Sequence, residues 1–129
     1  FGTAITIDIV TKEGEFLGGN ITPGVQSRFR ALHDYTARLP LLSMPDDPQA
    51  GIPLVADSTN DAITSGVING IQFEIEGYIE QLSARHESLK IIFTGGDGIF
   101  FAKRLKNTIF ATYDLVVHGL NRILEYNAD

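Results

Sequence analysis

The sequence predicts an α/β domain, and three observations lead to this prediction. β-branched and polar residues alternate over residues 4–10, a pattern typical of a strand with one buried face. Apolar residues recur at helical spacing through the long segment 58–82. Strand-like and helix-like segments then alternate to the end of the chain, as in α/β folds. The predicted order is strand, strand, helix, helix, strand, helix, strand, helix.

The first part of the chain is predicted to form a hairpin and a helix. Turn residues separate the first strand from a second strand that begins at residue 16. Thr22-Pro23 has the chemistry of a helix start, and apolar residues follow at helical spacing as far as Leu39. A proline directly after Leu39 ends this helix. The proline- and glycine-rich segment 43–57 is predicted to be an exposed loop.

The second predicted helix carries an apolar stripe and a stripe of small residues. Ser58 can cap its start, with Asp61 in the capping-box position. Because glycine costs about 1 kcal/mol in a helix interior, the small-residue stripe predicts close packing or close ligand approach. The apolar stripe consists of Ile63, Val67, Ile71, Ile75, Ile79 and Leu82, and the small-residue stripe of Ala62, Gly66 and Gly70.

The last third of the chain is predicted to alternate between strands and helices. A third strand is expected at residues 89–93 and a helix at residues 99–105. The basic residues at 103–106 are interpreted as the solvated face of that helix. A short strand at residues 115–117 and a last helix at residues 120–126 complete the domain.

Composition excludes several classes of function. The net charge is −6, which argues against a nucleic-acid partner because phosphate binding needs clustered lysine and arginine. The absence of cysteine excludes disulfides and thiolate chemistry, and it fits a reducing cytoplasm. No apolar run reaches the roughly 18 residues of a membrane span, so no membrane partner is expected. The three histidines lack metal-ligand spacing, so no metal site is predicted.

Three glycine-containing segments are candidates for phosphate binding. Residues 2–4 precede the first strand, residues 18–24 join a strand to a helix, and residues 94–97 follow the third strand. Small residues let backbone amides approach a phosphate closely, and helix N-termini attract anions. Each segment also has a purely structural interpretation: a tight turn, a bend with a cap, and a helix cap at Asp97. The third segment lacks the Gly-Lys-Ser/Thr of a Walker A loop.

The order and spacing of these motifs carry more information than any motif alone. The motifs are GTAITID at 2–8, GGNITPG at 18–24, AL at 31–32, TARLP at 36–40, TNDAITSG at 59–66, TGGD at 94–97 and DLVVHGLN at 114–121. This series resembles the type III pantothenate kinase family, and the resemblance covers nearly all of the chain.

The resemblance implies a ribonuclease-H-like domain, one half of the two-domain fold of the sugar kinases, Hsp70 and actin. Residues 1–129 would be the C-terminal domain of a kinase whose N-terminal domain is absent from this sequence. The implied reaction transfers the γ-phosphoryl group of ATP to the primary hydroxyl of pantothenate, at the start of coenzyme A synthesis. It also implies Mg²⁺, a monovalent cation (K⁺ or NH₄⁺) and a cytoplasmic homodimer whose pantothenate site is completed across the interface.

The resemblance also assigns roles to individual residues. Gly2 and Thr3 would bind ATP at its phosphates, and Gly95 and Gly96 would line the nucleotide side of the cleft. Thr59 would contact pantothenate bound by the neighbouring subunit.

The catalytic base would lie upstream of this chain. The family's N-terminal phosphate loop and the aspartate for the monovalent cation would also precede Phe1, so we expect the isolated chain to be inactive. Two alternatives remain: a non-catalytic accessory or regulatory interaction protein of the same fold, and a kinase of this type with another acceptor. A glycine-rich phosphate loop and a base motif before Phe1 would favour the enzyme.

Overall fold

The computed structural model describes residues 1–128, and its elements follow the predicted order. The strands form two separate sheets: β1 pairs antiparallel with β2, and β3 pairs parallel with β4. The elements are β1 (Ala4–Val10), β2 (Phe16–Pro23), α1 (Val25–Asp34), α2 (Thr59–Ser83), β3 (Ile91–Phe93), α3 (Gly98–Arg104), β4 (Ile109–Ala111) and α4 (Leu115–Ala128).

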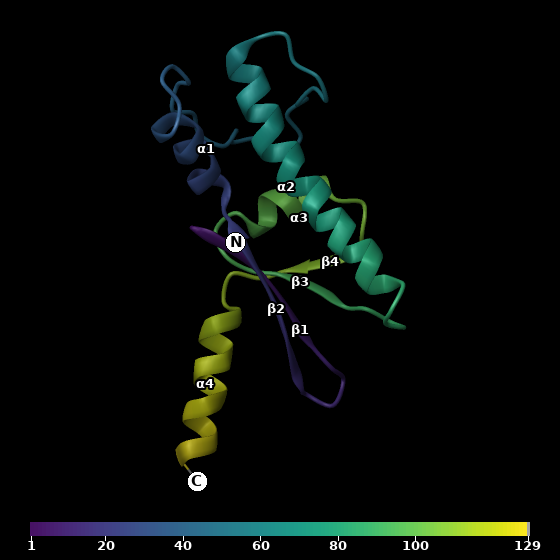
Figure 1. Ribbon diagram of the computed structural model, residues 1–129. Helices are drawn as coiled ribbons and strands as arrows, with labels where there is room; N and C mark the ends of the chain where they lie inside the picture. Colours follow the sequence, from purple (N-terminus) through teal and green to yellow (C-terminus); the bar gives the residue numbers. More distant parts are fainter. Residues whose placement is uncertain (129) are drawn as a thin grey trace.

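The hydrophobic core lies between α2 and the strands, with α1 and α3 at its sides (Figure 1). The predicted apolar stripe of α2 is confirmed, because five of its members are buried and Leu82 is half-buried. Phe93 of β3 and Phe100 and Phe101 of α3 contribute aromatic rings to this core. The buried apolar residues are Ile5, Val25, Phe29, Ile63, Val67, Ile68, Ile71, Ile75, Ile79, Phe93, Phe100, Phe101 and Leu105.

The start of α2 has the predicted capping box. The Ser58 hydroxyl accepts a hydrogen bond from the Asp61 N–H at 3.2 Å and donates to the Asp61 carboxylate at 2.6 Å. Further along the helix, Ser65 and Asn69 both donate to the carbonyl of Pro53. The loop before α2 is therefore held against the N-terminal half of the helix.

The small-residue stripe of α2 is open to solvent in this chain. Ala62 and Gly66 are exposed and Gly70 is half-exposed. A Cβ atom built on Gly66 or Gly70 would meet nothing within 4 Å. The close packing that this stripe predicts is therefore not made inside the described chain.

Two element boundaries differ from the prediction at the C-terminal end. The strand predicted at residues 115–117 is wrong: these residues form the first turn of α4, where the His118 N–H bonds to the Asp114 carbonyl at 2.8 Å. The last strand, β4, lies earlier, with Ile109 opposite Ile91 of β3. Valine favours strands only where a strand partner exists, and within residues 1–128 the paired strands do not include residues 115–117.

Three other predictions also need correction. Thr22 and Pro23 do not start the first helix: they end β2, and α1 begins at Val25. The first helix ends at Asp34, because the Thr36 hydroxyl then bonds back to the Leu32 carbonyl in competition with the helical ladder. In the basic cluster at 103–106, Arg104 is not a solvated side chain. Its guanidinium donates to the Pro48 carbonyl at 2.9 Å and lies 5.9 Å from the centre of the Phe100 ring.

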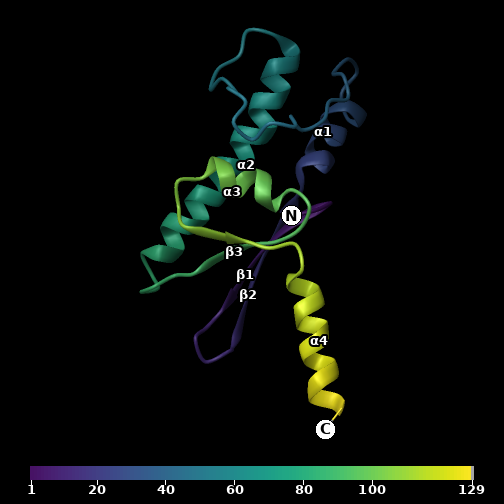
Figure 2. The ribbon, with the colours of Figure 1, turned by 180° about the vertical axis from the view of Figure 1, so that it is seen from behind.

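The last helix, α4, extends away from the rest of the molecule (Figures 1 and 2). None of its residues is buried. No helix within residues 1–128 is long and apolar enough to cross a membrane. The large apolar side chains that α4 exposes are Leu115, Val116, Val117, Leu120, Ile123, Leu124 and Tyr126.

Candidate functional site

Two of the predicted phosphate-binding segments meet at the start of β1. The amino group of Phe1 donates to the carbonyl of Thr94 at 2.8 Å. Gly95 has a φ of +92°, and a Cβ atom there would lie 2.1 Å from the Phe1 carbonyl oxygen. Only glycine fits at this position, because the backbone conformation and the close approach both exclude a side chain. Gly2 and Thr3 therefore lie directly beside the segment that contains Gly95.

The third glycine-containing segment reaches the same place from β2. The carbonyl of Thr3 accepts hydrogen bonds from the Gly24 N–H at 2.9 Å and from the Ser27 hydroxyl at 2.7 Å. A Cβ atom on Gly24 would lie 1.9 Å from the Gly2 carbonyl oxygen. The N-terminus of α1 is thus packed against Gly2 and Thr3. The three glycine-containing segments and the N-terminus of α1 therefore converge here.

Thr3 and Gly96 present the exposed surface of this cluster. Both residues are exposed. Within residues 1–128 the Thr3 hydroxyl makes no hydrogen bond, so it can donate to a ligand oxygen. A Cβ atom on Gly96 would meet nothing within 4 Å, so space remains above its backbone.

Asp97 directly precedes α3, but its side chain does not cap the helix. The side chain makes no capping hydrogen bond, so the role as a helix cap that the sequence suggested for Asp97 is not found. Burial raises the pKa of the Asp97 carboxyl, and the nearby amino group of Phe1 opposes this shift.

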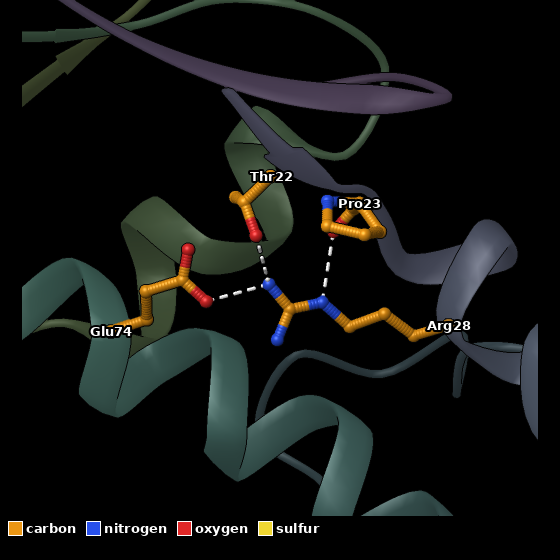
Figure 3. A network of polar contacts seen from close by, with 4 residues as sticks. All are labelled: Thr22, Pro23, Arg28 and Glu74. Atoms are coloured by element: carbon orange, nitrogen blue, oxygen red, sulfur yellow. Dashed lines mark hydrogen bonds and ion pairs between the residues drawn. The ribbon is translucent and has the colours of Figure 1, made fainter. Parts of the chain in front are cut away.

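A polar network fixes the turn between β2 and α1 (Figure 3). The Arg28 guanidinium donates to the Thr22 hydroxyl at 2.9 Å, to the Pro23 carbonyl at 2.8 Å and to the Glu74 carboxylate at 2.6 Å. Arg28 and Glu74 are both half-buried. The network ties the glycine-containing turn to α2. Sequence reasoning missed Arg28, since its partner Glu74 lies 46 residues away and no local pattern signals the pair.

We expect Arg28→Met to lower the free energy of unfolding by about 1–3 kcal/mol, because Glu74 then loses its charged partner in a half-buried site. Urea denaturation of the purified chain measures this change. Arg30→Met, at an exposed position of the same helix, is the matched control and should change stability little. Equal denaturation midpoints for the two variants would contradict the structural role of the network.

We also expect Gly95→Ala to destabilise the chain by at least about 1 kcal/mol. A left-handed backbone costs alanine about this much, before its overlap with Phe1 is relieved. Gly96→Ala is the neighbouring control, since Gly96 has open space and no positive φ. Thermal unfolding of both variants checks the difference. A Gly95→Ala variant as stable as Gly96→Ala would rule out the tight contact.

Thr59 lies apart from this cluster. It is the exposed first residue of α2. The C-terminal half of that helix, with Ile75 and Ile79, is the part that faces β1 and β3. The start of α2 is at the far end of the helix from these strands (Figure 1). The structure therefore brings Gly2, Thr3, Gly95 and Gly96 together, and leaves Thr59 outside the cluster.

Comparisons with known proteins indicate the family of the chain. A family model described as type III pantothenate kinase matches residues 1–81. The type III pantothenate kinase of Flavobacterium psychrophilum is 46% identical over 125 residues, covering 97% of this chain and 50% of that protein. The one of Porphyromonas gingivalis is 49% identical over 129 residues, covering 98% of this chain and 51% of that protein.

A solved structure supports the same fold. A conserved protein from Campylobacter jejuni, described as a Baf family transcriptional activator, superimposes with a TM-score of 0.72 at 29% identity. The match covers 98% of this chain and 55% of that one.

The fold and the converging glycine segments define a small mixed α/β domain of the kinase type. The chain belongs to the type III pantothenate kinase family. It spans about half the length of the curated relatives that it matches.

Proposed function

We propose that the chain is the C-terminal, ribonuclease-H-like domain of a kinase that transfers the γ-phosphoryl group of ATP to pantothenate, which begins coenzyme A synthesis. The observation that carries the proposal is the convergence of Gly2 and Thr3 with Gly95 in a chain that resembles pantothenate kinases along its whole length. The relatives are about twice as long, so the remaining half would supply the facing wall of the ATP cleft.

The roles that we propose for individual residues follow from phosphoryl-transfer chemistry. This chemistry depends on positioning the reacting groups and on neutralising the phosphate charge. The Thr3 hydroxyl and the backbone of Gly2 would hold ATP phosphate oxygens. Gly95 and Gly96 would line the nucleotide side of the cleft. Mg²⁺ and a monovalent cation (K⁺ or NH₄⁺) would neutralise phosphate charge when bound. By resemblance to the family, we assign the protein ligands of these cations, and the catalytic base, to the other half.

We further propose a homodimer formed through the small-residue stripe of α2. The stripe is exposed, and Phe73 on the same side of the helix is 52% exposed. Apolar helix faces are seldom left in water, and two-fold contacts are the commonest in homo-oligomers. Thr59, at the start of the same helix, would then contact pantothenate bound by the partner subunit. A cytoplasmic location stays a prediction.

In the longer protein that contains both halves, we expect Thr3→Val to lower kcat/KM for ATP by about 10- to 100-fold. A hydrogen bond to a charged phosphate is worth about 1.5–3 kcal/mol, and valine removes it with little change of volume. A coupled assay of ADP release at varied ATP measures the effect. Thr108→Val is the control, at an exposed threonine outside the cluster. Unchanged ATP kinetics in a folded Thr3→Val protein would contradict the proposed phosphate contact and would indicate that Thr3 has only a structural role in the turn.

A second candidate function is a non-catalytic regulatory protein of the same fold. The observation that favours it is the description of the similar Campylobacter jejuni protein as a transcriptional activator. The two candidate functions differ in whether the longer protein releases ADP from ATP when pantothenate is present. Pantothenate-dependent release of ADP from ATP supports the kinase, and its absence from a folded protein that binds neither compound supports the regulatory role.

A further inference from the structure

Two hydrogen bonds to its carbonyl oxygen hold Thr3 in place. The donors are the Gly24 N–H at 2.9 Å and the Ser27 hydroxyl at 2.7 Å. Both donors lie in the short segment that joins β2 to α1. Thr3 itself lies just before β1 and is exposed, so packing against the core does not fix it. The position of the Thr3 hydroxyl therefore depends on how firmly the segment after β2 is held.

Arg28 holds the outer side of this segment. The Gly24 bond makes Thr3 and Gly24 a bonded pair of the antiparallel ladder. Bonded and non-bonded pairs alternate, so the next pair, Ala4 with Pro23, is a non-bonded one. The Pro23 carbonyl therefore points away from β1, and Arg28 Nε donates to it at 2.8 Å. One side of the turn thus bonds to Thr3 and the opposite side bonds to the guanidinium.

The same guanidinium joins the turn to α2. Its Nη2 atom donates to the Thr22 hydroxyl at 2.9 Å and to the Glu74 carboxylate at 2.6 Å (Figure 3). The next residue of α2, Ile75, is buried in the core, so the backbone at Glu74 is fixed. The side chains of Arg28 and Glu74 are 22% and 27% exposed, so solvent and salt screen this ion pair less than a fully exposed one.

These contacts need a fork of donors. Nε reaches a carbonyl while Nη2 reaches a hydroxyl and a carboxylate, and the planar guanidinium fixes the two directions relative to each other. A lysine ammonium is a single point charge, so it can pair with Glu74 but cannot occupy both donor positions. Arginine is therefore required for the whole network, whereas any long cationic side chain can make the ion pair.

We propose that Arg28 is a positioning residue for the ATP site. It holds residues 22–24 against α2, and these residues in turn hold Thr3 where its hydroxyl meets the ATP phosphates. This role rests on the kinase function proposed above, and in particular on the phosphate contact of Thr3. Arg28 acts through the turn and not on ATP itself. The effect of removing Arg28 on ATP use should therefore not exceed the effect of removing the Thr3 hydroxyl.

The test uses the longer protein that contains both halves, in an ADP-release assay with ATP and pantothenate varied in turn. We expect Arg28→Met to lower kcat/KM for ATP by at least about fivefold, because Thr3 is no longer held at the phosphates. The KM for pantothenate should change by less than about twofold, since no pantothenate contact is assigned to this turn. Arg30→Met, at an exposed position of α1, is the matched control and should leave both values unchanged.

A double-mutant cycle with Thr3→Val separates positioning from a general loss of structure. Because Arg28 acts through Thr3, Arg28→Met should lower kcat/KM for ATP by less than about twofold once residue 3 is valine. Arg28→Lys gives a second comparison that does not depend on the stability of the methionine variant. Lysine keeps the ion pair with Glu74, so the midpoint of urea denaturation should stay close to the wild-type value. The kcat/KM for ATP should nevertheless remain at least about threefold low, because the fork is lost.

Amide hydrogen exchange of Gly24 measures the hold on the turn without catalysis. The Gly24 N–H bonds to Thr3, so we expect it to exchange at least about tenfold faster in Arg28→Lys than in the wild-type protein. The amide of Ile71, in the buried part of α2, should keep its rate and serves as the internal control.

Three results would each overturn the positioning role: effects of Arg28→Met and Thr3→Val that multiply independently, an Arg28→Lys protein with full ATP kinetics, or unchanged exchange at Gly24. Failure of the proposed function gives a different pattern. Faster exchange at Gly24 in a longer protein without kinase activity contradicts only that function, because Arg28 then holds a turn that does not bind ATP. An active protein in which the Arg28 variants behave like Arg30→Met contradicts only the positioning role.

Discussion

Residues 1–129 alone are expected to release ADP from ATP and pantothenate at least about 10³-fold more slowly than a full-length relative. Positioned acid–base groups contribute about 10²–10⁴-fold to such reactions, and electrostatic positioning of the developing charge contributes about 10²–10³-fold more. The described residues hold the three glycine-containing segments on one side of the proposed cleft, and they hold no cluster of carboxylates. The resemblance to the family places the base that activates the acceptor hydroxyl in the other half, so we expect residues 1–129 to supply only part of the proposed site.

A coupled ADP-release assay on purified residues 1–129 measures this difference, with the Flavobacterium psychrophilum relative as the positive control. Adding the other half of that relative as a separate chain should restore part of the activity in the wild-type chain. It should restore less with Gly95→Ala, which disturbs the contact with Phe1. Turnover approaching about 1 per second by the chain alone would show that the catalytic groups lie within residues 1–129.

Local patterns predicted most of the fold because they report which face of an element is buried. The spacing of Ile63, Val67 and Ile71 fixed the core side of α2, and the Ser58–Asp61 capping box fixed its start. The pattern failed at residues 115–117, where valines begin α4. Alternation and β-propensity carry no information about whether a strand partner exists, and that is decided by the tertiary fold.

The candidate site was predicted as separate segments, and the structure adds how they meet. No sequence pattern indicates that the Thr3 carbonyl accepts from Gly24 and Ser27, or that Gly95 is packed on Phe1. These are contacts between residues distant in the sequence.

The small-residue stripe of α2 is the surface through which we propose that the dimer forms. Gly66 and Gly70 each reduce helix propensity by about 1 kcal/mol relative to alanine. Neither glycine has a positive φ, and neither is approached within 4 Å by another part of this chain. The described chain thus contains no contact that explains two glycines on this face. A second copy of α2 packed along the stripe would explain them, because helix axes approach most closely where the side chains at the contact are small.

Gly70→Leu is therefore expected to raise the dissociation constant of the dimer of the longer protein by at least about 100-fold, as the larger side chain holds the two helices apart. The fold itself should survive, since leucine is the better helix former by about 0.8 kcal/mol and open space surrounds Gly70. Because Thr59 is proposed to complete the partner's acceptor site, the KM for pantothenate should rise while the KM for ATP changes little. Sedimentation velocity and steady-state kinetics measure the two effects. Gln26→Leu, at an exposed position of α1, controls for the added apolar surface. A Gly70→Leu protein that remains dimeric, with an unchanged KM for pantothenate, would place the interface elsewhere.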